Sequence, residues 1–302
     1  MKRILVIGSS KKDTNETAVV EAMAAYSHKA IGSDIVSRAD FCHLDEIGYV
    51  IQNDSVQLFN MRDSLDLSEY DLVWFRGKLA SAINIAATAS QYLQAKGIPT
   101  VNTAYANRRA VGKIAQMCQL VDMNLPIPKT VSASVKYLPD LIEKHLSYPA
   151  IVKDVKGAHG NNNYLVASKD ELLSILHGNE HMDFMAQEFI ENDGDYRVLL
   201  VGNQTMIIKR KGIDGSHLNN TSQGATASII PLDEFPAEVV RDARIFAKAC
   251  EYEIAGVDVI FDKNTNKHYF LEINSQPQLA SGVFLDEKSA MLGTYFRNLL
   301  SS

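Results

Sequence analysis

Two acidic residues and an asparagine near the C-terminus have the types and spacing of a divalent-cation site. Asp258 lies in one β-rich run of the sequence, and Glu272 and Asn274 lie in the next. If the connection turns about Thr265, Asp258 lies opposite Glu272, and Glu272 shares a strand face with Asn274 because side chains alternate along a strand. Facing carboxylates repel each other and need water or a cation between them. Mg²⁺ prefers such oxygen ligands, so the hairpin predicts a Mg²⁺ or Mn²⁺ site, unless its acids are simply solvated at a sheet edge.

A lysine and a glycine-containing loop have the composition of a phosphate-binding segment. Lys153 ends the apolar run 149–153, and Gly157 and Gly160 follow before Asn161–Asn163. Glycine and asparagine tolerate positive φ, so such a loop can aim backbone N–H groups at phosphate oxygens, with the lysine as a point charge. The segment is not a P-loop, because no Gly-Lys-Ser/Thr occurs and no helix is expected to follow. A flexible exposed loop is the alternative interpretation.

Further charged residues stand at the ends of expected strands. Arg76 follows the run 70–75, where a guanidinium can bind both oxygens of a substrate carboxylate or lie solvated at the surface. The run 206–209 continues into Arg210 and Lys211, which suit either phosphate binding or a solvated strand end.

The segment from Gln187 to Ile190 ends another expected strand, and Asp195 follows after a polar turn. A carboxylate beside a strand end can accept hydrogen bonds from a ribose diol, and it can equally cap the turn. The residues alone leave these two interpretations open.

The elements that position these residues follow two patterns. In the first part of the chain, strands and helices alternate; strands are expected at 1–8, 33–36, 70–75 and 98–102, helices at 16–28 and 80–96, and a hairpin about 53–54. This alternation predicts a parallel sheet covered by helices, with ligands beyond the carboxyl ends of its strands. From residue 149 onward strands dominate, and the other helices are expected at 109–121, 137–145, 236–250 and 285–299.

Composition narrows the set of partners. A chain of 302 residues has room for two or three packed units. Its net charge of −6 argues against general nucleic-acid binding, which needs a basic face. Its three cysteines, Cys42, Cys118 and Cys250, lack metal-ligand spacing and are expected to be reduced. The apolar runs are too short for a signal peptide or a membrane span, so we expect a cytoplasmic protein without a membrane partner.

Taken together, six segments resemble the ATP-grasp superfamily and, within it, the RimK-like ligases. They are Lys113 before Leu125–Thr130, Lys153 before Gly157–Gly160, Gln187–Ile190, Asp195–Arg197, Leu218–Asn220 ahead of Gly224, and Gly256–Asp258 with Leu271–Asn274 and Pro277. Each segment alone is a weak motif. All six occur in the order and approximate spacing of the family and cover nearly the whole chain.

The resemblance implies both a fold and an activity. The fold is an α/β N-terminal (pre-ATP-grasp) domain at 1–104, followed by an α+β ATP-grasp fold whose two subdomains grip ATP. One subdomain, 105–187, carries the glycine loop, and the other, 188–302, carries the metal site. The activity is that of an ATP- and Mg²⁺-dependent ligase that joins a carboxylate to an amine through an acyl phosphate. The implied partners are ATP, a carboxylate substrate, an amino-acid or peptide amine, and further copies of the chain in a homodimer or tetramer.

The resemblance also implies roles for single residues. The implied nucleotide ligands are Lys113, Lys153, Gly157, Gly160, Gln187, Glu188, Phe189, Ile190, Asp195 and Asn220, with Asp195 at the ribose. The implied metal ligands are Asp258, Glu272 and Asn274. The cation at the transferred phosphate is Arg210 or Lys211, and the strand-end argument adds Arg76 for the substrate carboxylate.

Two departures from the family pattern and three rival hypotheses accompany this prediction. Asn161–Asn163 stand where relatives usually carry glycine or small residues, and Gly224-Ala225 replaces a Gly-Gly pair. The rivals are an ATP-grasp kinase, a synapsin-like nucleotide-binding protein without chemistry, and a two-domain sugar or amino-acid binding protein with fortuitous acids. The sequence does not identify which acid and which amine are joined.

Overall fold

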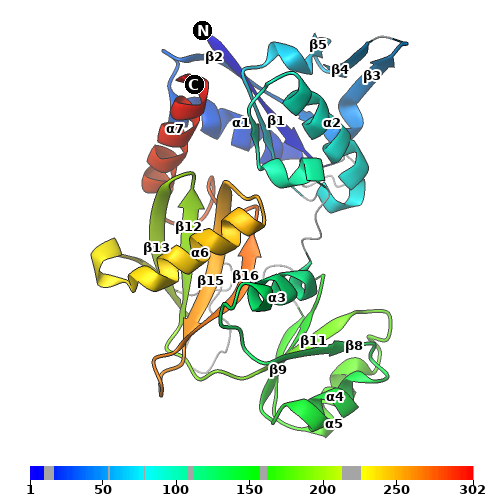
Figure 1. Ribbon diagram of the computed structural model, residues 1–302, viewed down its shortest axis with the longest axis vertical. Helices are drawn as coiled ribbons and strands as arrows, with labels where there is room; N and C mark the ends of the chain where they lie inside the picture. Colours follow the sequence, from blue (N-terminus) through cyan, green and yellow to red (C-terminus); the bar gives the residue numbers. More distant parts are fainter. Residues whose placement is uncertain are drawn as a thin grey trace.

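The computed structural model describes residues 1–9, 17–53, 55–77, 79–107, 112–156, 162–212 and 226–301. Three main sheets follow one another along the long axis of the molecule (Figure 1). The N-terminal parallel sheet lies at the top of this view, a large antiparallel sheet lies in the middle, and a small antiparallel sheet lies at the bottom.

The N-terminal sheet is parallel, in the order β2-β1-β6-β7. Its strands and helices are β1 (Lys2–Gly8), β2 (Val36–His43), β6 (Leu72–Phe75), β7 (Thr100–Val101), α1 (Thr17–Ile31) and α2 (Ile83–Ala95). Both faces of the sheet are covered, because Ile4 and Val6 of β1 belong to one apolar core while Leu5 and Ile7 belong to another. The predicted parallel α/β sheet is confirmed.

The second strand begins later than the sequence predicted. A strand was expected at 33–36, but Gly32 has a φ of +106° and residues 33–35 form a turn. The strand starts at Val36 and pairs with β1 as far as Gly8 opposite His43. Two apolar residues in a row could not distinguish a turn from a strand, and pairing with β1 decided the boundary.

A three-stranded antiparallel sheet projects from the N-terminal region (Figure 1). It consists of β3 (Ile47–Ile51), β4 (Val56–Asn60) and β5 (Leu65–Asp66), so the hairpin predicted about residues 53–54 is confirmed. Short 3₁₀ helices occur at Leu44–Glu46, Leu67–Glu69, Leu79–Ala82, Thr103–Asn107 and Leu232–Glu234.

The small antiparallel sheet has the order β10-β9-β11-β8. Its elements are β8 (Thr130–Ala133), α4 (Leu138–His145), β9 (Ala150–Asp154), β10 (Asn163–Val166), α5 (Lys169–Leu176) and β11 (Phe184–Glu188), and α3 (Lys113–Asp122) precedes them. Helix α5 was not expected from the sequence. Its signal is the N-cap Ser168, whose side chain accepts from the backbone N–H of Glu171, while the Glu171 carboxylate accepts from the N–H of Ala167.

The large antiparallel sheet has the order β14-β13-β12-β15-β16. Its elements are β12 (Asp195–Val201), β13 (Gln204–Lys211), β14 (Thr226–Ile230), α6 (Ala237–Ala249), β15 (Ile254–Phe261), β16 (His268–Asn274) and α7 (Leu285–Ser301). Helix α6 packs Val239 and Phe246 against one face of the sheet, together with Val257 and Phe270. Because this face is apolar and covered by α6, the polar side chains of β15 and β16 lie on the opposite face of the sheet.

The other face of the large sheet shares an apolar core with the N-terminal sheet. Leu199 and Ile208 of the large sheet, Phe296 of α7, and Ile4 and Trp74 of the N-terminal sheet belong to one cluster. The carboxyl end of β6 lies beside the segment that follows β16, because Gln276 Nε2 donates to the Phe75 carbonyl and Arg76 Nη2 donates to the Pro277 carbonyl. Among the helices in the described ranges, none has the length and apolarity needed to cross a membrane.

Candidate active site

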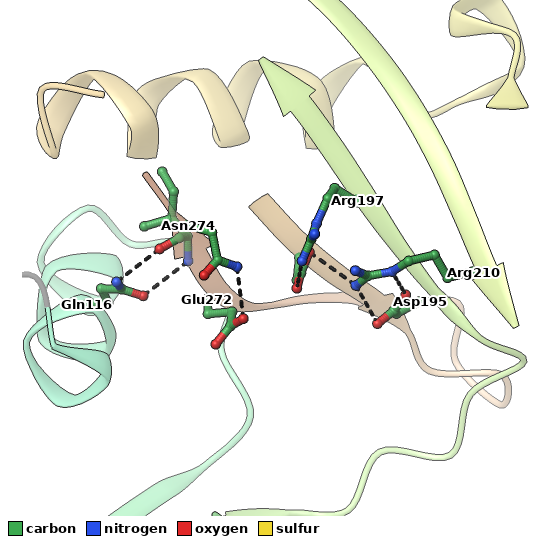
Figure 2. Close-up of polar contacts among 8 residues, drawn as sticks. Gln116, Asp195, Arg197, Arg210, Glu272 and Asn274 are labelled. Carbon is green, nitrogen blue, oxygen red and sulfur yellow. Dashed lines mark hydrogen bonds and ion pairs between the residues drawn. The ribbon is translucent and has the colours of Figure 1, made fainter. Parts of the chain in front are cut away.

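The acidic hairpin has the geometry predicted from alternation. Asp258 of β15 lies opposite Glu272 of β16, with a register shift directly after Asp258. The Asn274 Nδ2 donates to Glu272 Oε1 at 2.9 Å, so these two side chains lie on the same face (Figure 2). Val257 and Ile273 point into the core below α6. The three oxygen-bearing side chains are thus collected on the face opposite α6.

A helix side chain fixes the edge strand that carries these groups. Gln116 of α3 donates its Nε2 to the Ile273 carbonyl at 3.0 Å, and its Oε1 accepts from the Ile273 N–H at 3.1 Å (Figure 2). Because β16 is the last strand of the sheet, the amide replaces a missing strand neighbour. Gln116 was not expected to belong to the site, because a polar side chain three residues after Lys113 gives no sign of a partner 157 residues away in the chain.

Two arginines hold Asp258. The Arg197 Nε and Nη2 atoms donate to its two carboxylate oxygens, each at 2.8 Å, and Arg210 Nη2 lies 3.2 Å from Oδ1 (Figure 2). Burial alone would raise the pKa of Asp258, but the two guanidiniums lower it to about 2. The carboxylate is therefore ionised at neutral pH. Arg197 lies in the motif Asp195–Arg197, which implied no role for the arginine itself.

The donor set fits a hard cation. A carboxylate has about four lone-pair positions, and the arginines use three of those on Asp258. The Glu272 carboxylate accepts a hydrogen bond from the Asn274 side chain. Its remaining lone pairs are available to a metal ion. The described residues contain no group of three or more His, Cys, Asp or Glu that could hold a metal ion.

Asp195 and Arg210 form a buried ion pair across β12 and β13. The Arg210 Nε and Nη2 atoms donate to the two Asp195 oxygens at 2.6 and 2.7 Å. Burial raises the pKa of Asp195 to about 6, against the opposing charge of Arg210. Both oxygens are thus committed to a guanidinium, and the role at the ribose stays a prediction. The geometry gives Asp195 a direct part in orienting Arg210.

The structure favours one of the two candidate cations at the transferred phosphate. Arg210 is buried beside Asp258, whereas its neighbour Lys211 is exposed at the end of β13. Successive side chains of a strand point to opposite faces, so only one of the pair can face the hairpin. Arg210 is that residue.

Lys113, at the start of α3, and Lys153, on β9 of the small sheet, lie beside each other near the hairpin. Lys113 donates its Nζ to the carbonyl of Asp154, the residue after Lys153, at 3.2 Å. Burial lowers the pKa of Lys153 to about 8, with Lys113 lowering it further and Glu272 opposing the shift. The two lysines and the acidic hairpin of β15 and β16 thus share one electrostatic environment, although α3, β9 and the hairpin are separate elements.

The segment from Gln187 to Ile190 joins these two sheets. The Gln187 side chain is buried and donates to Thr130 Oγ1 at 2.9 Å, and Glu188 Oε1 accepts from the Lys129 N–H at 2.7 Å. Ile190 is buried and Phe189 is half-buried. The contacts fix the connection between β11 and β12, and the expected adenine contact stays a prediction.

Arg76 is a buried residue, which excludes the alternative of a solvated surface arginine. Its Nη2 donates to the Pro277 carbonyl at 3.2 Å, and its guanidinium lies 5.0 Å from the Trp74 ring centroid. Its Nη1 is buried without a partner among the described residues. Burial lowers the pKa of Arg76 to about 10, so it remains charged at neutral pH. The free Nη1 leaves a donor for a ligand at the junction of β6 and the segment after Asn274.

Three expected nucleotide ligands, Gly157, Gly160 and Asn220, lie outside the described residues. Their assignments stay predictions. The remaining site residues come from the end of β6 and from α3, β9, β11, the segment between β11 and β12, β12, β13, β15 and β16, which are separate in sequence. An α/β domain packed on an antiparallel sheet, with a smaller sheet opposite a carboxylate hairpin, defines an ATP-grasp protein.

Sequence comparison identifies the family. The RimK-like ATP-grasp domain matches residues 110–286, which is more than half of the chain, and the chain belongs to this family. A protein from Haemophilus influenzae named "Probable alpha-L-glutamate ligase" is 26% identical over 218 residues, which are 70% of each chain. Its namesake from a Marinomonas species is 26% identical over 284 residues, 92% of this chain and 88% of the relative.

Solved structures share the fold over nearly the whole chain. The D-alanine–D-alanine ligase from Bacillus anthracis has a TM-score of 0.67 at 16% identity, covering 100% of this chain and 98% of that one. The ATP-grasp ligase PsnB, solved with a minimal precursor, Mg and ADP, has a TM-score of 0.64 at 17% identity, covering 99% and 96%. The expected ATP-grasp fold is confirmed.

Proposed function

We propose that this protein activates a carboxylate with ATP and joins it to the amine of an amino acid or peptide. The chain is an ATP-dependent ligase that forms C–N bonds, as its RimK-like family and the named glutamate ligases among its relatives support. The observation that carries the proposal is the collection of Asp258, Glu272 and Asn274 on one sheet face, within the electrostatic reach of Lys153.

Each group has a distinct task in this proposal. Glu272, Asn274 and Asp258 hold Mg²⁺, which when bound neutralises phosphate charge and lets a carboxylate approach. Lys113 from α3 and Lys153 from β9 hold the phosphate tail. Arg210, oriented by its ion pair, lies beside Asp258, where it can stabilise charge on the transferred phosphoryl group.

The reaction needs positioning and electrostatics more than a covalent nucleophile. A substrate carboxylate oxygen attacks the γ-phosphorus of ATP, and the bond to ADP breaks, which leaves an acyl phosphate. The amine then attacks the acyl carbon, phosphate leaves, and the amine loses a proton. Arg76 is the proposed ligand of a substrate carboxylate, since its buried Nη1 has no described partner.

A phosphate-release screen tests the proposal. The protein, ATP and Mg²⁺ are incubated with pairs of amino acids and short peptides, and products are identified by mass spectrometry. Phosphate, ADP and an amide in equal amounts support the ligase. ADP with a phosphorylated product and no free phosphate indicates a kinase, and tight ATP binding without turnover indicates a scaffold. Absence of Mg²⁺-dependent ATP binding by calorimetry would reject the nucleotide site altogether.

The remaining expectations belong with this proposal. The use of ATP and the absence of a disulfide among Cys42, Cys118 and Cys250 support a cytoplasmic location. A homo-oligomer is proposed from the family resemblance, and sedimentation velocity tests it. The division into units 1–104, 105–187 and 188–302 is also a proposal, which limited proteolysis tests.

A further inference from the structure

A small cavity beside the metal hairpin is lined by three cationic side chains. The other lining residues are Pro277 and Gln278 and the apolar Leu199, Ile208 and Val283, and the three cations are Arg197, Arg210 and Lys288. The cavity measures about 30 Å³. One water molecule needs roughly 10–15 Å³ on the same measure, so there is room for about two oxygen-sized groups. This is the size of a carboxylate head.

Each of the two arginines has N–H donors that are not used by its carboxylate partner. Arg197 uses Nε and Nη2 on Asp258, and Arg210 uses Nε and Nη2 on Asp195. Within the described ranges, neither guanidinium has a partner for its Nη1. A guanidinium carries five N–H donors, so each can hold its carboxylate and still donate to a second anion.

Lys288, in the first turn of α7, is the third cation and is only 4% exposed. Its Nζ donates to the Ser281 carbonyl over 3.4 Å, and it forms no ion pair with a described carboxylate. Burial and the charge of Arg197 lower its pKa to about 8, while the exposed Glu287 opposes the shift. The lysine is therefore mostly charged at pH 7, and the cluster of three cations and two carboxylates has one positive charge in excess.

We propose that this cavity is an anion subsite that binds a substrate carboxylate other than the one that ATP activates. The proposal rests on the proposed ligase function. An α-amino acid acceptor carries a carboxylate next to its amine, and a diacid substrate carries a second carboxylate. Ammonium and guanidinium groups form strong charge-assisted hydrogen bonds with either. Because Arg210 lines the cavity and also pairs with Asp258, a carboxylate bound there keeps the rest of the substrate beside the hairpin.

Calorimetry on the full chain, saturated with Mg²⁺ and a non-hydrolysable ATP analogue, tests the subsite. The probes are L-glutamate, the same molecule with its α-carboxylate converted to an amide, and glutarate, which lacks the amine. The expected result is that L-glutamate binds about tenfold or more tightly than its α-amide, because a charged hydrogen-bonded pair is lost. In Lys288→Met this difference should shrink to within about twofold.

Matched variants separate the charge of Lys288 from its packing. Lys288→Arg retains a cation and should retain the preference for the free carboxylate. Lys248→Met removes an exposed lysine from α6 and should also retain it. Thermal melting of each variant verifies that it is folded.

The probes distinguish the two sources of the carboxylate. Loss of the glutamate–amide difference in Lys288→Met assigns the subsite to the amine substrate. Weaker binding of glutarate in Lys288→Met, with the α-amide binding as well as glutamate, assigns it to a diacid. If no probe binds more weakly to Lys288→Met than to the unsubstituted protein, the subsite is rejected. The ligase function is rejected separately, if the nucleotide analogue itself shows no Mg²⁺-dependent binding.

Discussion

At the scale of single residues, the site combines groups whose charges depend on one another. Asp258 stays ionised because two arginines hold it, and Lys153 keeps a low pKa because it is buried beside another lysine. Neither state follows from the residue type alone. Both affect how the site receives a metal ion and a phosphate tail.

Glu272 is the carboxylate of the hairpin with the fewest protein partners. Replacement by alanine removes a proposed metal ligand from an otherwise intact strand edge, so Mg²⁺-dependent phosphate release should fall by about 100-fold or more, within the ~2.7–4 kcal/mol cost of losing one preorganised charge-stabilising group. Initial rates at several Mg²⁺ concentrations measure the effect. Glu238→Ala, at an exposed position of α6, is the control and should keep full activity. Release by Glu272→Ala at the unsubstituted rate would refute its role.

Lys153 makes nucleotide affinity depend on pH. Burial first, and then Lys113, lower its pKa to about 8 in the free protein, so it is charged at pH 7 and loses its proton as pH rises. Bound phosphates favour the charged form, so above pH 8 nucleotide binding must take up a proton and affinity should fall by up to about tenfold per pH unit. Calorimetry in buffers of different ionisation enthalpy measures this proton uptake.

The control variant for this titration is Lys153→Arg, because arginine stays charged over the whole pH range that is measured. Lys153→Arg should bind nucleotide with an affinity that changes little between pH 8 and pH 9.5, while Lys136→Arg, at an exposed position, should behave like the unsubstituted protein. An unchanged pH profile in Lys153→Arg would show that another group titrates.

At the scale of elements, one ion network crosses the central strands. Asp195 and Arg197 lie on β12, Arg210 on β13 and Asp258 on β15. The strands are hydrogen-bonded neighbours, so the network adds side-chain contacts to a continuous ladder. It fixes the orientation of Arg210 relative to the metal hairpin.

Asp195→Ala should destabilise the fold strongly. The change leaves Arg210 buried with the more distant contact to Asp258, and breaking a buried pair from one side costs about 3–5 kcal/mol. Urea unfolding measures the free energy of unfolding. Asp193→Ala, at an exposed position in the preceding turn, should change it by less than about 0.5 kcal/mol. A stable Asp195→Ala variant with weakened ATP binding would instead support the predicted ribose contact.

At the scale of the whole molecule, the C-terminal helix joins the N-terminal sheet to the large sheet. Trp74 packs edge-on against Phe296 of α7, with ring centroids 5.3 Å apart, and Arg297 donates to the carbonyls of Ala30 and Ile31 at the end of α1. The same core includes Leu199 of the large sheet. These contacts hold the two sheets together and so determine the position of Arg76 relative to Pro277, in the segment after β16.

Gly293 allows this close approach of α7 to α1. A Cβ atom at this position would lie 2.0 Å from the Ala30 carbonyl oxygen, which is backbone and cannot rotate away. Gly293→Ala should therefore lower the free energy of unfolding by about 1–3 kcal/mol, as for an overpacked core. Ala290→Ser, an exposed change on the same helix, should have little effect. An unaffected melting temperature in Gly293→Ala would show that the helices separate without cost.

Local patterns were enough to predict some of the site. Alternation along two strands predicted that Asp258, Glu272 and Asn274 share a face, since the period of a strand determines side-chain direction. Arg197, Gln116 and Lys288 carried no such signal. Their partners are 61 residues away for Arg197 and Asp258, and 157 for Gln116 and Ile273, so no periodicity connects them.

The sequence by itself predicted the parallel N-terminal sheet, the hairpin that carries Asp258, Glu272 and Asn274, and the family, because each depends on local periodicity or on motifs in a set order. Only the tertiary structure decided that Arg210 rather than Lys211 faces the hairpin, that Arg76 is buried, and that Lys288 completes a cationic cavity. The physical reason is that charge, burial and hydrogen-bond partners depend on segments that meet only after the sheets have packed together.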